Sequence, residues 1–574
     1  MKTYIVIGGV AGGATAAARL RRLDERARII LFERGAHISY ASCGLPYYIG
    51  GAIKDREDLF VQTPESFSKR FGIDVRTRTE VLKIIPSTKR IMARNLATGE
   101  EYEEGYSQLV LSPGADPVKP PIQGIEQDGV FTLRNVDDAD GIMKYIEEKK
   151  PQRAVIVGAG FIGLEMAENL HQRGIMVTIV EMAEQVMTML DFEMAAMAHQ
   201  HLKLKNVEFY LKDKVISFSR ENNRIIVNLE SKRNISCDMV LLSIGVRPEC
   251  KLAKEADLQI GPTCGIVVNE FLQTSNPDIY AVGDAIEFSN PIINKRMHTY
   301  LAGPANKQGR IAADNIVLGN KRRYHGSIAT AIARVFDLTV AFTGISEKVL
   351  KSENIPYIST ITHSPCHAGY YPGAMPVTLK IIFSPKEGRL LGAQVLGYQG
   401  ADKRIDILST LIQKRGTIYD LMEMEQAYAP PYSSAKDPVN IAGFVAENIL
   451  NGLIRIVQWY DLCETENGEN YLLDVRTRDE YESGTIQGAV NIPLNDLRER
   501  MGEIPTDRKI VIFCAAGLRG YLAARILSQN GFENVCNLSG GYITYQLATL
   551  KQGNEDIFEK EYIAKDDIIY EKRE

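Results

Sequence analysis

Two short apolar runs, at residues 4–7 and 154–157, are each followed by a glycine-rich turn. A helical segment follows each turn, and a second apolar run then ends at an acidic residue, Glu33 in the first segment and Glu181 in the second. Apolar runs of roughly four to eight residues between turns are typical of buried strands. Each segment therefore predicts a strand, a helix and a parallel strand, the repeating unit of an α/β fold.

The two glycine turns are suited to bind a dinucleotide. Glycines let the backbone approach a pyrophosphate at the N-terminus of a helix, and an acid at the end of the second strand can bind ribose hydroxyls. In the first turn Val10 occupies the place of the middle glycine, and we expect the neighbouring glycines to supply the flexibility. The predicted contacts are Gly8, Gly9, Ala11, Gly12, Gly13 and Glu33 in the first unit, and Gly158, Gly160, Gly163 and Glu181 in the second.

Composition narrows the class of protein. A chain of 574 residues predicts about three or four domains of ~150 residues. Its formal net charge of -5 excludes a global basic field for nucleic acid. The start of the sequence runs directly into a strand, unlike a signal peptide, and no apolar stretch is long enough to span a bilayer. Eight cysteines without close pairs fit a reducing compartment, so we expect a cytoplasmic protein.

Cys43 is the strongest candidate for redox chemistry. It follows the first nucleotide-binding unit, and Tyr48 stands where an enzyme with a Cys-x4-Cys disulfide carries its second thiol. When oxidised, Cys43 must therefore form a disulfide with a substrate thiol or become a sulfenic acid. The residues around it leave both outcomes open.

Three further segments, residues 39–51, 109–115 and 274–284, carry a family resemblance. Together with the glycine turns they resemble the pyridine nucleotide-disulfide oxidoreductase family, and specifically its coenzyme A-disulfide reductase branch, over about residues 1–450. The resemblance implies FAD on the first unit and NAD(P)H on the second. Because Glu181 would repel a 2′-phosphate, NADH is favoured. The additional cofactor contacts implied are Arg34, Ala115 and Asp284.

The same resemblance implies the sulfur chemistry and its partners. Cys43 would rest as a mixed disulfide with coenzyme A, in surroundings that lower the pKa of its thiol below about 8.5. In a homodimer, Tyr370 and Tyr428 would enter the partner's active site and hydrogen-bond or protonate a departing thiolate, with Tyr371 as a rival for the first role. The coenzyme A contacts implied are Thr15, Arg19, Arg22, Ser39, Ser42, Lys69, Arg70, Asn306, Arg310 and Lys436.

A separate domain begins after residue 452. An apolar run at residues 510–513 leads into a loop with the pattern Cys-x2-Gly-x-Arg, from Cys514 to Arg519, and then a helix. The segment resembles a rhodanese domain. Backbone N–H groups at the start of a helix stabilise a thiolate or persulfide anion, and Arg519 adds a positive charge. We expect Cys514 to accept sulfane sulfur.

No metal site is predicted. His363, Cys366 and His367 share one loop without a distant fourth ligand, which favours a structural role for them. The predicted fold is α/β, with two Rossmann-like dinucleotide-binding domains, an α/β dimerisation domain and a rhodanese α/β domain. The predicted boundaries are 1–115 and 251–323 for the FAD domain, 116–250 for the NAD(P)H domain, 324–451 for dimerisation, 460–550 for rhodanese and 551–574 for a charged tail.

The function predicted from these features is NAD(P)H-dependent reduction of coenzyme A disulfide and of coenzyme A persulfide or polysulfide, with Cys514 relaying sulfane sulfur. One alternative is an NADH oxidase or peroxidase that uses a Cys43 sulfenic acid. Those relatives carry His where this chain has Val10, which argues against it. The other alternative is a sulfur carrier or redox sensor without turnover.

Overall fold

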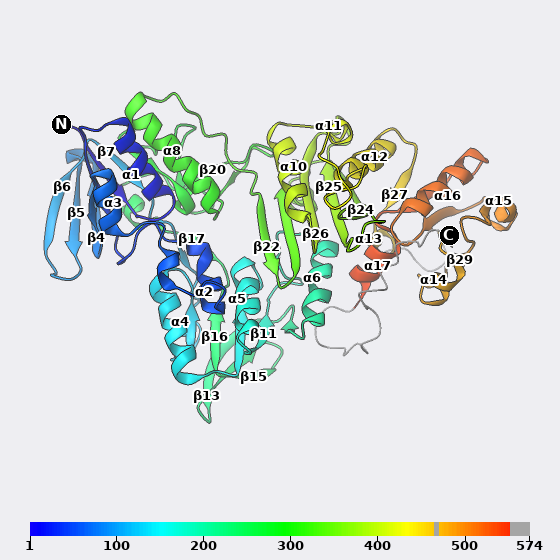
Figure 1. Ribbon diagram of the computed structural model, residues 1–574, viewed down its shortest axis with the longest axis horizontal. Coiled ribbons are helices and arrows are strands. Elements are labelled where there is room, and N and C mark those ends of the chain that lie inside the picture. Colours follow the sequence, from blue (N-terminus) through cyan, green and yellow to red (C-terminus); the bar gives the residue numbers. More distant parts are fainter. Residues whose placement is uncertain (464–469, 551–574) are drawn as a thin grey trace. The chain divides into compact units, whose positions relative to one another are not determined.

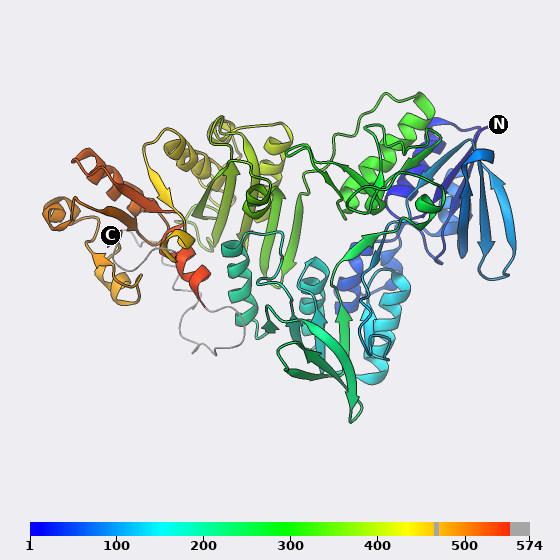
Figure 2. The same ribbon diagram turned by 180° about the vertical axis from the view of Figure 1, so that it is seen from behind.

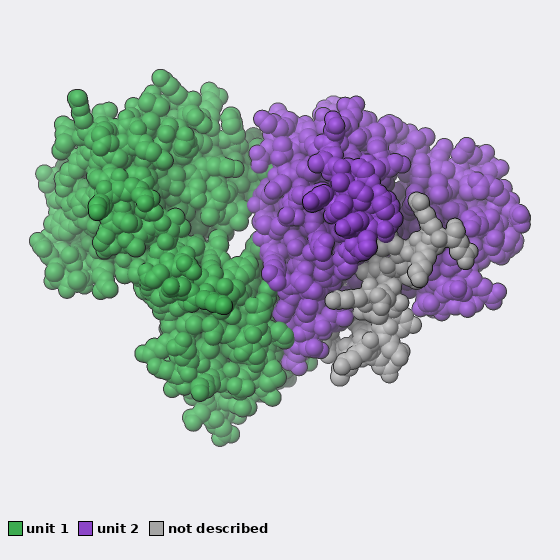
Figure 3. Space-filling model, in the orientation of Figure 1, with its two compact units in different colours: residues 1–182, 212–329 green, residues 183–211, 330–574 purple. Residues whose placement is uncertain are grey.

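The structure, a computed structural model, describes residues 1–463 and 470–550. They form two compact units (Figure 3). Unit 1 comprises residues 1–182 and 212–329, and unit 2 comprises residues 183–211 and the described residues from 330 onward. The predicted charged tail, 551–574, lies outside the described residues. Within the part described, none of the helices has the length and apolar character needed to cross a membrane.

The first nucleotide-binding unit is built on a parallel sheet with the strand order β19-β7-β1-β2-β3. Helix α1 (Gly12–Leu23) follows the glycine turn, and its alanines are buried because they pack closely against neighbouring elements. Helix α8 (Ala302–Leu318) lies beside α1 (Figure 1). The strands are β1 (Thr3–Ile7), β2 (Arg28–Phe32), β3 (Asp74–Arg76), β7 (Gln108–Leu111) and β19 (Ile279–Ala281).

The second nucleotide-binding unit repeats this arrangement. Strand β10 (Arg153–Val157) pairs in parallel with β11 (Met176–Val180) and β16 (Met239–Leu242), and β16 pairs with β9 (Val130–Thr132). Helix α5 (Phe161–Gln172) follows its glycine turn, and α4 (Val136–Lys149) precedes β10. Both strand–helix–strand units predicted from the apolar pattern are therefore present.

Short ribbons and helices complete unit 1. Strands β8 (Ala115–Pro117) and β17 (Val246–Pro248) pair where the chain enters and leaves the second nucleotide-binding unit. The segment that carries Cys43 consists of the short helices η1 (Ser42–Gly44) and α2 (Leu45–Gly50). The ribbons are β4 (Thr79–Ile85), β5 (Arg90–Asn95) and β6 (Glu101–Gly105); β13 (Val215–Glu221), β14 (Arg224–Leu229) and β15 (Asn234–Cys237); and β18 (Ile266–Val267), β20 (Ile286–Ser289) and β21 (Arg296–Met297).

Unit 2 contains an antiparallel sheet with the strand order β22-β23-β26-β25-β24, seen from opposite sides in Figure 1 and Figure 2. Every residue of β26 is buried, because this strand lies in the middle of the sheet. The strands are β22 (Ala331–Val335), β23 (Leu338–Gly344), β24 (Ile358–Pro365), β25 (Pro376–Phe383) and β26 (Leu390–Gly397). The helices are α6 (Phe192–Leu204), α9 (Glu347–Ser352), α10 (Ala401–Gln413), α11 (Ile418–Glu423) and α12 (Pro438–Leu450).

The remainder of unit 2 is a parallel sheet with the order β27-β31-β30-β28-β29. Hydrogen bonds join it to β24: the Ile361 N–H donates to Ser539 Oγ at 3.1 Å, and the His363 Nε2 lies 2.9 Å from Thr544 Oγ1. The strands are β27 (Arg455–Val457), β28 (Asn470–Asp474), β29 (Val490–Asn491), β30 (Lys509–Phe513) and β31 (Val535–Leu538). The helices are α13 (Trp459–Cys463), α14 (Arg478–Glu482), α15 (Leu497–Arg500), α16 (Leu518–Gln529) and α17 (Gly541–Thr549).

Candidate active sites

The first glycine turn forms a cradle that only glycine permits. Gly8 has a φ of +96°, and a Cβ there would lie 2.0 Å from the carbonyl oxygen of Ser112. A Cβ on Gly13 would lie 1.9 Å from the carbonyl oxygen of Gly8. Helix α1 has no side-chain cap at its N-terminus, so its first N–H groups remain available for an anion. The turn fits the pyrophosphate of a dinucleotide.

The acid predicted at the end of each second strand lies next to its glycine turn. Glu33 accepts hydrogen bonds from the Gly9 N–H at 2.9 Å and the Gly35 N–H at 2.8 Å. In the second unit, Glu181 accepts from the Ala159 N–H at 2.7 Å. These bonds fix each carboxylate where the ribose of a nucleotide on the turn would lie. Both nucleotide-binding units therefore fit a dinucleotide.

Asp284 lies in the short helix η4 (Gly283–Ala285), within the first nucleotide-binding unit. Burial raises the pKa of its carboxyl group to about 6, an effect that the positive charge of Arg134 partly opposes. A buried carboxyl group of this kind is suited to hydrogen-bond the hydroxyls of a ligand. Ala115, another predicted contact, is buried at the start of β8, whereas Arg34 is exposed and pairs with Asp116 at 3.1 Å.

Cys43 lies in η1 and is exposed, although neighbouring atoms enclose much of its sulfur. This partial burial raises the pKa of its thiol, and the carboxyl groups of Glu165 and Asp284 raise it further, while a hydrogen bond with Ser42 lowers it. The direction is opposite to the expected lowering, because burial disfavours the thiolate and the nearby carboxyl groups add negative charge. A lowered pKa at Cys43 would require positive charge or hydrogen-bond donors from a bound group.

Glu165 is a site residue that the sequence did not reveal. It lies on α5, which packs against α2, and the Tyr47 hydroxyl donates to its Oε1 at 3.5 Å. Burial raises the pKa of Glu165 to about 7. The residue belongs to the helix of the second glycine turn, 122 positions after Cys43, so only packing brings it to the thiol.

The predicted coenzyme A contacts of unit 1 lie in three places. Thr15 donates to Asn306 Oδ1 at 2.5 Å, which joins α1 to α8, and Arg310 is exposed one helical turn further along α8. Arg19 forms an ion pair of 2.7 Å with the buried Asp314, whereas Arg22 is exposed. The remaining contacts are Ser39 and the exposed Ser42 beside Cys43, and Lys69 and Arg70 in the last turn of α3 (Pro64–Phe71).

The two predicted tyrosines of unit 2 are hydrogen-bonded to each other. The hydroxyls of Tyr370 and Tyr428 lie 2.8 Å apart, and this bond raises the pKa of Tyr428. Both side chains are exposed, with fractional exposures of 76% and 48%. The rival, Tyr371, instead packs edge-on against His367, with ring centroids 5.6 Å apart. The predicted contact Lys436 is exposed in the segment that follows Tyr428.

Arg404, which the sequence analysis did not single out, holds the two tyrosine loops together. Its buried guanidinium donates to the Cys366 carbonyl oxygen at 2.8 Å and to Asp437 Oδ2 at 2.7 Å. The Ala368 N–H also donates to the Ser433 carbonyl oxygen at 2.9 Å. An arginine in the first turn of an amphipathic helix gives no local signal for such a role, because its partners lie on distant loops.

Cys514 begins the predicted loop at the carboxyl end of β30. The Gly517 N–H donates to its sulfur at 3.1 Å, as expected for a loop that curls around an anionic sulfur. The Tyr542 N–H donates to the Cys514 carbonyl oxygen at 2.8 Å, which ties the loop to α17. Arg519, on the first turn of α16, forms two hydrogen bonds of 2.7 Å with the carboxylate of Glu480 on α14.

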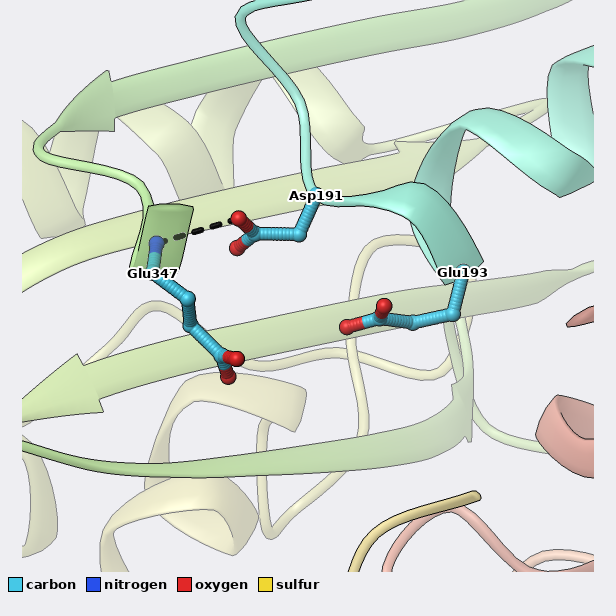
Figure 4. Close-up of side chains that lie close together, drawn as sticks. All are labelled: Asp191, Glu193 and Glu347. Atoms are coloured by element: carbon cyan, nitrogen blue, oxygen red, sulfur yellow. Dashed lines mark hydrogen bonds between the residues drawn. The ribbon is translucent and has the colours of Figure 1, made fainter. Parts of the chain in front are cut away.

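Unit 2 also contains a buried cluster of three carboxylates, those of Asp191, Glu193 and Glu347 (Figure 4). The ammonium group of Lys380 lies among them, 2.9 Å from Asp191 and 3.0 Å from Glu347, and also contacts Glu193. Burial alone would lower the pKa of Lys380, but the carboxylates raise it well above its ordinary value. The cluster is therefore occupied by a side-chain cation and links α6 to the sheet.

Comparisons with known proteins agree with this architecture. Residues 2–309 match the family described as pyridine nucleotide-disulphide oxidoreductase, residues 330–438 match its dimerisation domain, and residues 459–548 match a rhodanese-like domain. The coenzyme A disulfide reductase of Staphylococcus haemolyticus (strain JCSC1435) is 35% identical over 450 residues, 78% of this chain and 100% of that protein.

Two solved structures resemble nearly the whole chain. The reduced Bacillus anthracis CoADR-RHD is 50% identical, with a TM-score of 0.93 over 95% of this chain and 98% of that one. An NAD-dependent persulfide reductase from A. fulgidus is 39% identical, with a TM-score of 0.89 over 95% of this chain and 100% of that one. The predicted α/β fold, with its dimerisation and rhodanese domains, is confirmed. The chain belongs to the pyridine nucleotide-disulphide oxidoreductase family and carries a rhodanese-like domain after its dimerisation domain.

Proposed function

We propose that this protein is an FAD-dependent enzyme that oxidises NAD(P)H and reduces disulfides and persulfides of coenzyme A. The observation that carries the proposal is a lone thiol, Cys43, beside a nucleotide-binding turn, with Tyr48 where a second thiol would stand. A disulfide at such a thiol requires a partner from outside the chain. The similarity to coenzyme A disulfide reductases and to a persulfide reductase supports coenzyme A as that partner.

The two glycine turns divide the cofactors between them. The first turn, with Glu33 and Asp284, would hold FAD, and the second, with Glu181, would hold the nicotinamide nucleotide. Glu181 favours NADH because its carboxylate would repel a 2′-phosphate. When bound, the flavin supplies two-electron transfer between the nicotinamide and sulfur.

Cys43 exchanges disulfides with the substrate. Its thiolate attacks one sulfur of coenzyme A disulfide, a bond from Sγ to that sulfur forms, and the second coenzyme A leaves as a thiolate. Two electrons from NADH and one proton then convert the mixed disulfide into the Cys43 thiolate and coenzyme A thiol. With a coenzyme A persulfide as substrate, the same attack on its outer sulfur releases coenzyme A, and the later reduction releases hydrosulfide.

The tyrosine pair would serve the leaving thiolate. We place Tyr370 and Tyr428 of each subunit at the Cys43 site of its partner in a homodimer, in agreement with the dimerisation domain of this family. Only one of the two hydroxyl protons is used in their mutual hydrogen bond, and the other phenol can donate its proton to a departing sulfur. The packing of Tyr371 against His367 supports Tyr370 as the member of the pair.

Coenzyme A would lie along α1 and α8. Thr15 and Asn306 form one edge, and the exposed Arg22 and Arg310 are available for its phosphates. Arg19 can contact the ligand only if its guanidinium binds the ligand and Asp314 at the same time. The further proposed contacts are Ser39, Ser42, Lys69, Arg70 and Lys436.

The rhodanese-like domain would deliver the substrate sulfur. Cys514 accepts a sulfane sulfur as a persulfide, which the N–H of Gly517 stabilises, and passes it to coenzyme A. Fusion to the reductase raises the local concentration of the persulfide at Cys43. We place the protein in the cytoplasm, since all eight cysteines are free.

Intact mass spectrometry of the purified holoenzyme tests the proposal. We expect an adduct with the mass of coenzyme A that reductant removes and that Cys43→Ser abolishes. A sulfenic acid without such an adduct would instead identify an oxidase or peroxidase. Cys514→Ser should retain NADH oxidation with coenzyme A disulfide and lose sulfane-sulfur transfer; loss of both activities in this variant would contradict the separate roles of the two thiols. A protein that binds FAD without turnover would be a carrier or sensor.

A further inference from the structure

The loop that holds the Cys514 sulfur carries a single charged side chain. Its residues from Cys514 to Arg519 are otherwise Ala, Gly and Leu, so the electrostatic field at the sulfur depends strongly on Arg519. Leu518 is 69% exposed and presents an apolar side chain on the outer side of this loop. The surroundings of Cys514 thus combine backbone N–H donors, a small apolar surface and one guanidinium.

That guanidinium is paired with a carboxylate. Both Nη atoms of Arg519 donate to Glu480, each at 2.7 Å, in the parallel geometry of a bidentate ion pair. Both side chains retain 19% of their exposure, so water screens the pair only partly. Between them the two side chains have a net charge of zero.

Glu480 is itself fixed. It occupies the third position of α14, and its Oε2 accepts from the Thr477 N–H at 2.8 Å and from the Thr477 hydroxyl at 3.1 Å. Burial opposes ionisation, but hydrogen bonds from Arg519 and Thr477 lower the pKa of Glu480 below its ordinary value. The carboxylate is therefore charged at neutral pH and is held beside Arg519.

The other arginine near this loop is also neutralised. Arg476 stacks on Tyr542, 4.2 Å from the ring centroid, and pairs with the buried Asp474 at 2.7 Å. It belongs to the packing between β28 and α17. Among the charged groups described around the loop, Arg476 and Arg519 are each matched by a carboxylate.

A site without net charge discriminates between sulfur donors by the negative charge that each donor carries. A thiol persulfide reacts with the Cys514 thiolate by transfer of its outer sulfur: the new Sγ–S bond forms, the donor S–S bond breaks, and a thiolate with one negative charge leaves. Thiosulfate reacts in the same way but brings two negative charges to the thiolate and releases sulfite with both. This second reaction needs positive charge at the loop, which the pairing of Arg519 withholds.

We propose that Glu480 is a specificity-determining residue, which neutralises Arg519 and thereby makes Cys514 prefer thiol persulfides to thiosulfate as sulfur donors. This inference rests on the proposed role of Cys514 as a sulfane-sulfur acceptor. The exposed Leu518 and the alanines of the loop agree with a donor that carries an organic group rather than an inorganic anion.

The test compares Glu480→Gln with a matched control, Glu482→Gln. Glu482 lies on the same helix and pairs with Arg478 at 2.8 Å, but this pair is exposed and does not involve Arg519. For the full-length holoenzyme, the single-turnover rate of Cys514 persulfidation is measured by intact mass with thiosulfate and with glutathione persulfide. We expect Glu480→Gln to raise the thiosulfate rate relative to the persulfide rate by about tenfold or more, and the control to keep the wild-type ratio.

An unchanged ratio in a folded Glu480→Gln protein would overturn the inference. If that variant does not fold, Glu480→Asp replaces it: the shorter carboxylate cannot keep both hydrogen bonds, so an intermediate ratio is expected, and the wild-type ratio would count against the role. Failure of the proposed function gives a different result, because wild-type Cys514 would then take sulfur from neither donor. The NADH-dependent reduction of coenzyme A disulfide should remain unchanged in all these variants.

Discussion

The phenolic oxygens of Tyr370 and Tyr428 lie 2.8 Å apart, although the two residues are 58 positions apart in the sequence. The loops that carry them meet because the buried Arg404 binds the backbone of one loop and Asp437 behind the other. The pair is thus preorganised within one subunit. At the site of a dimer partner the two hydroxyls would have a fixed relative position. One of them could then donate its proton to the substrate while the other hydrogen-bonds to it.

Removal of either hydroxyl should slow the reduction of coenzyme A disulfide. We expect Tyr428→Phe and Tyr370→Phe to lower kcat by about a hundredfold to a thousandfold, within the range of general acid catalysis, with a smaller change in KM. Steady-state NADH oxidation with the disulfide measures the effect. Tyr432→Phe is the control, since Tyr432 is exposed on the loop of Tyr428 and contributes a backbone carbonyl to Lys403. An equal loss in the control would mean that the loop, not the hydroxyl pair, matters.

The charge of Glu165 should determine the reactivity of Cys43 above neutral pH. The pKa of Glu165 is about 7, so its carboxylate forms as the pH rises through this value and opposes the Cys43 thiolate. Glu165→Gln should therefore lower the pKa of the Cys43 thiol. Alkylation of the reduced holoenzyme by iodoacetamide should be faster in the variant at about pH 8, and equal below about pH 6, where wild-type Glu165 is protonated.

The matched control for this experiment is Glu147→Gln, an exposed carboxylate on α4. It should leave the alkylation profile of Cys43 unchanged. Identical profiles for Glu165→Gln and wild type would show that Glu165 does not act on the sulfur.

His363 should make the stability of unit 2 depend on pH. Burial lowers the pKa of its imidazole from 6.5 to about 4, so the unfolded chain binds the proton more strongly than the folded one. The contribution is fully present above about pH 6.5 and is lost as the pH falls towards 4, with a total of about 3 kcal/mol. Calorimetry should reveal a decrease in Tm over this range that is shallower in His363→Gln. His325→Gln, at an exposed position, should keep the wild-type dependence.

Lys380 should be among the most sensitive positions for folding. Lys380→Met would leave the carboxylates of Asp191, Glu193 and Glu347 buried without their cation, which costs about 3–5 kcal/mol of the free energy of unfolding. The loss in denaturant midpoint should become smaller as the pH is lowered, because protonation of Glu347, whose pKa burial raises, relieves the repulsion. Lys386→Met, at an exposed position after the same strand, should have little effect. A comparable loss in both variants would contradict a specific role for the cluster.

The features that the sequence alone identifies are local ones. The two glycine turns depend on backbone conformations and close approaches that side chains would obstruct, so their residues identify them wherever they occur. The Cys514 loop is similar, since its sulfur, its N–H donors and the start of α16 all lie within six consecutive residues. Cys43 could be recognised because its own segment contains no second thiol.

The missed or misjudged features depend on distant residues. The sequence predicted a lowered pKa for Cys43, but the carboxyl groups that raise it come from α5 and η4. The contact of Arg19 with coenzyme A stays a prediction, and the structure adds an ion pair with Asp314, 295 positions away, that the sequence did not reveal. Neither partner can be recognised before the helices pack, because many surface arginines and glutamates look alike in a sequence.

The amino-acid sequence alone thus determined the two glycine turns and the α/β class and singled out two candidate reactive thiols, since each is encoded by the conformational limits or chemistry of a few neighbouring residues. The tertiary structure alone decided which charges surround those thiols: Glu165 near Cys43, and Glu480 on Arg519 beside Cys514. Electrostatic interactions depend on distance in space, and that distance is set only when strands and helices from different parts of the chain come together.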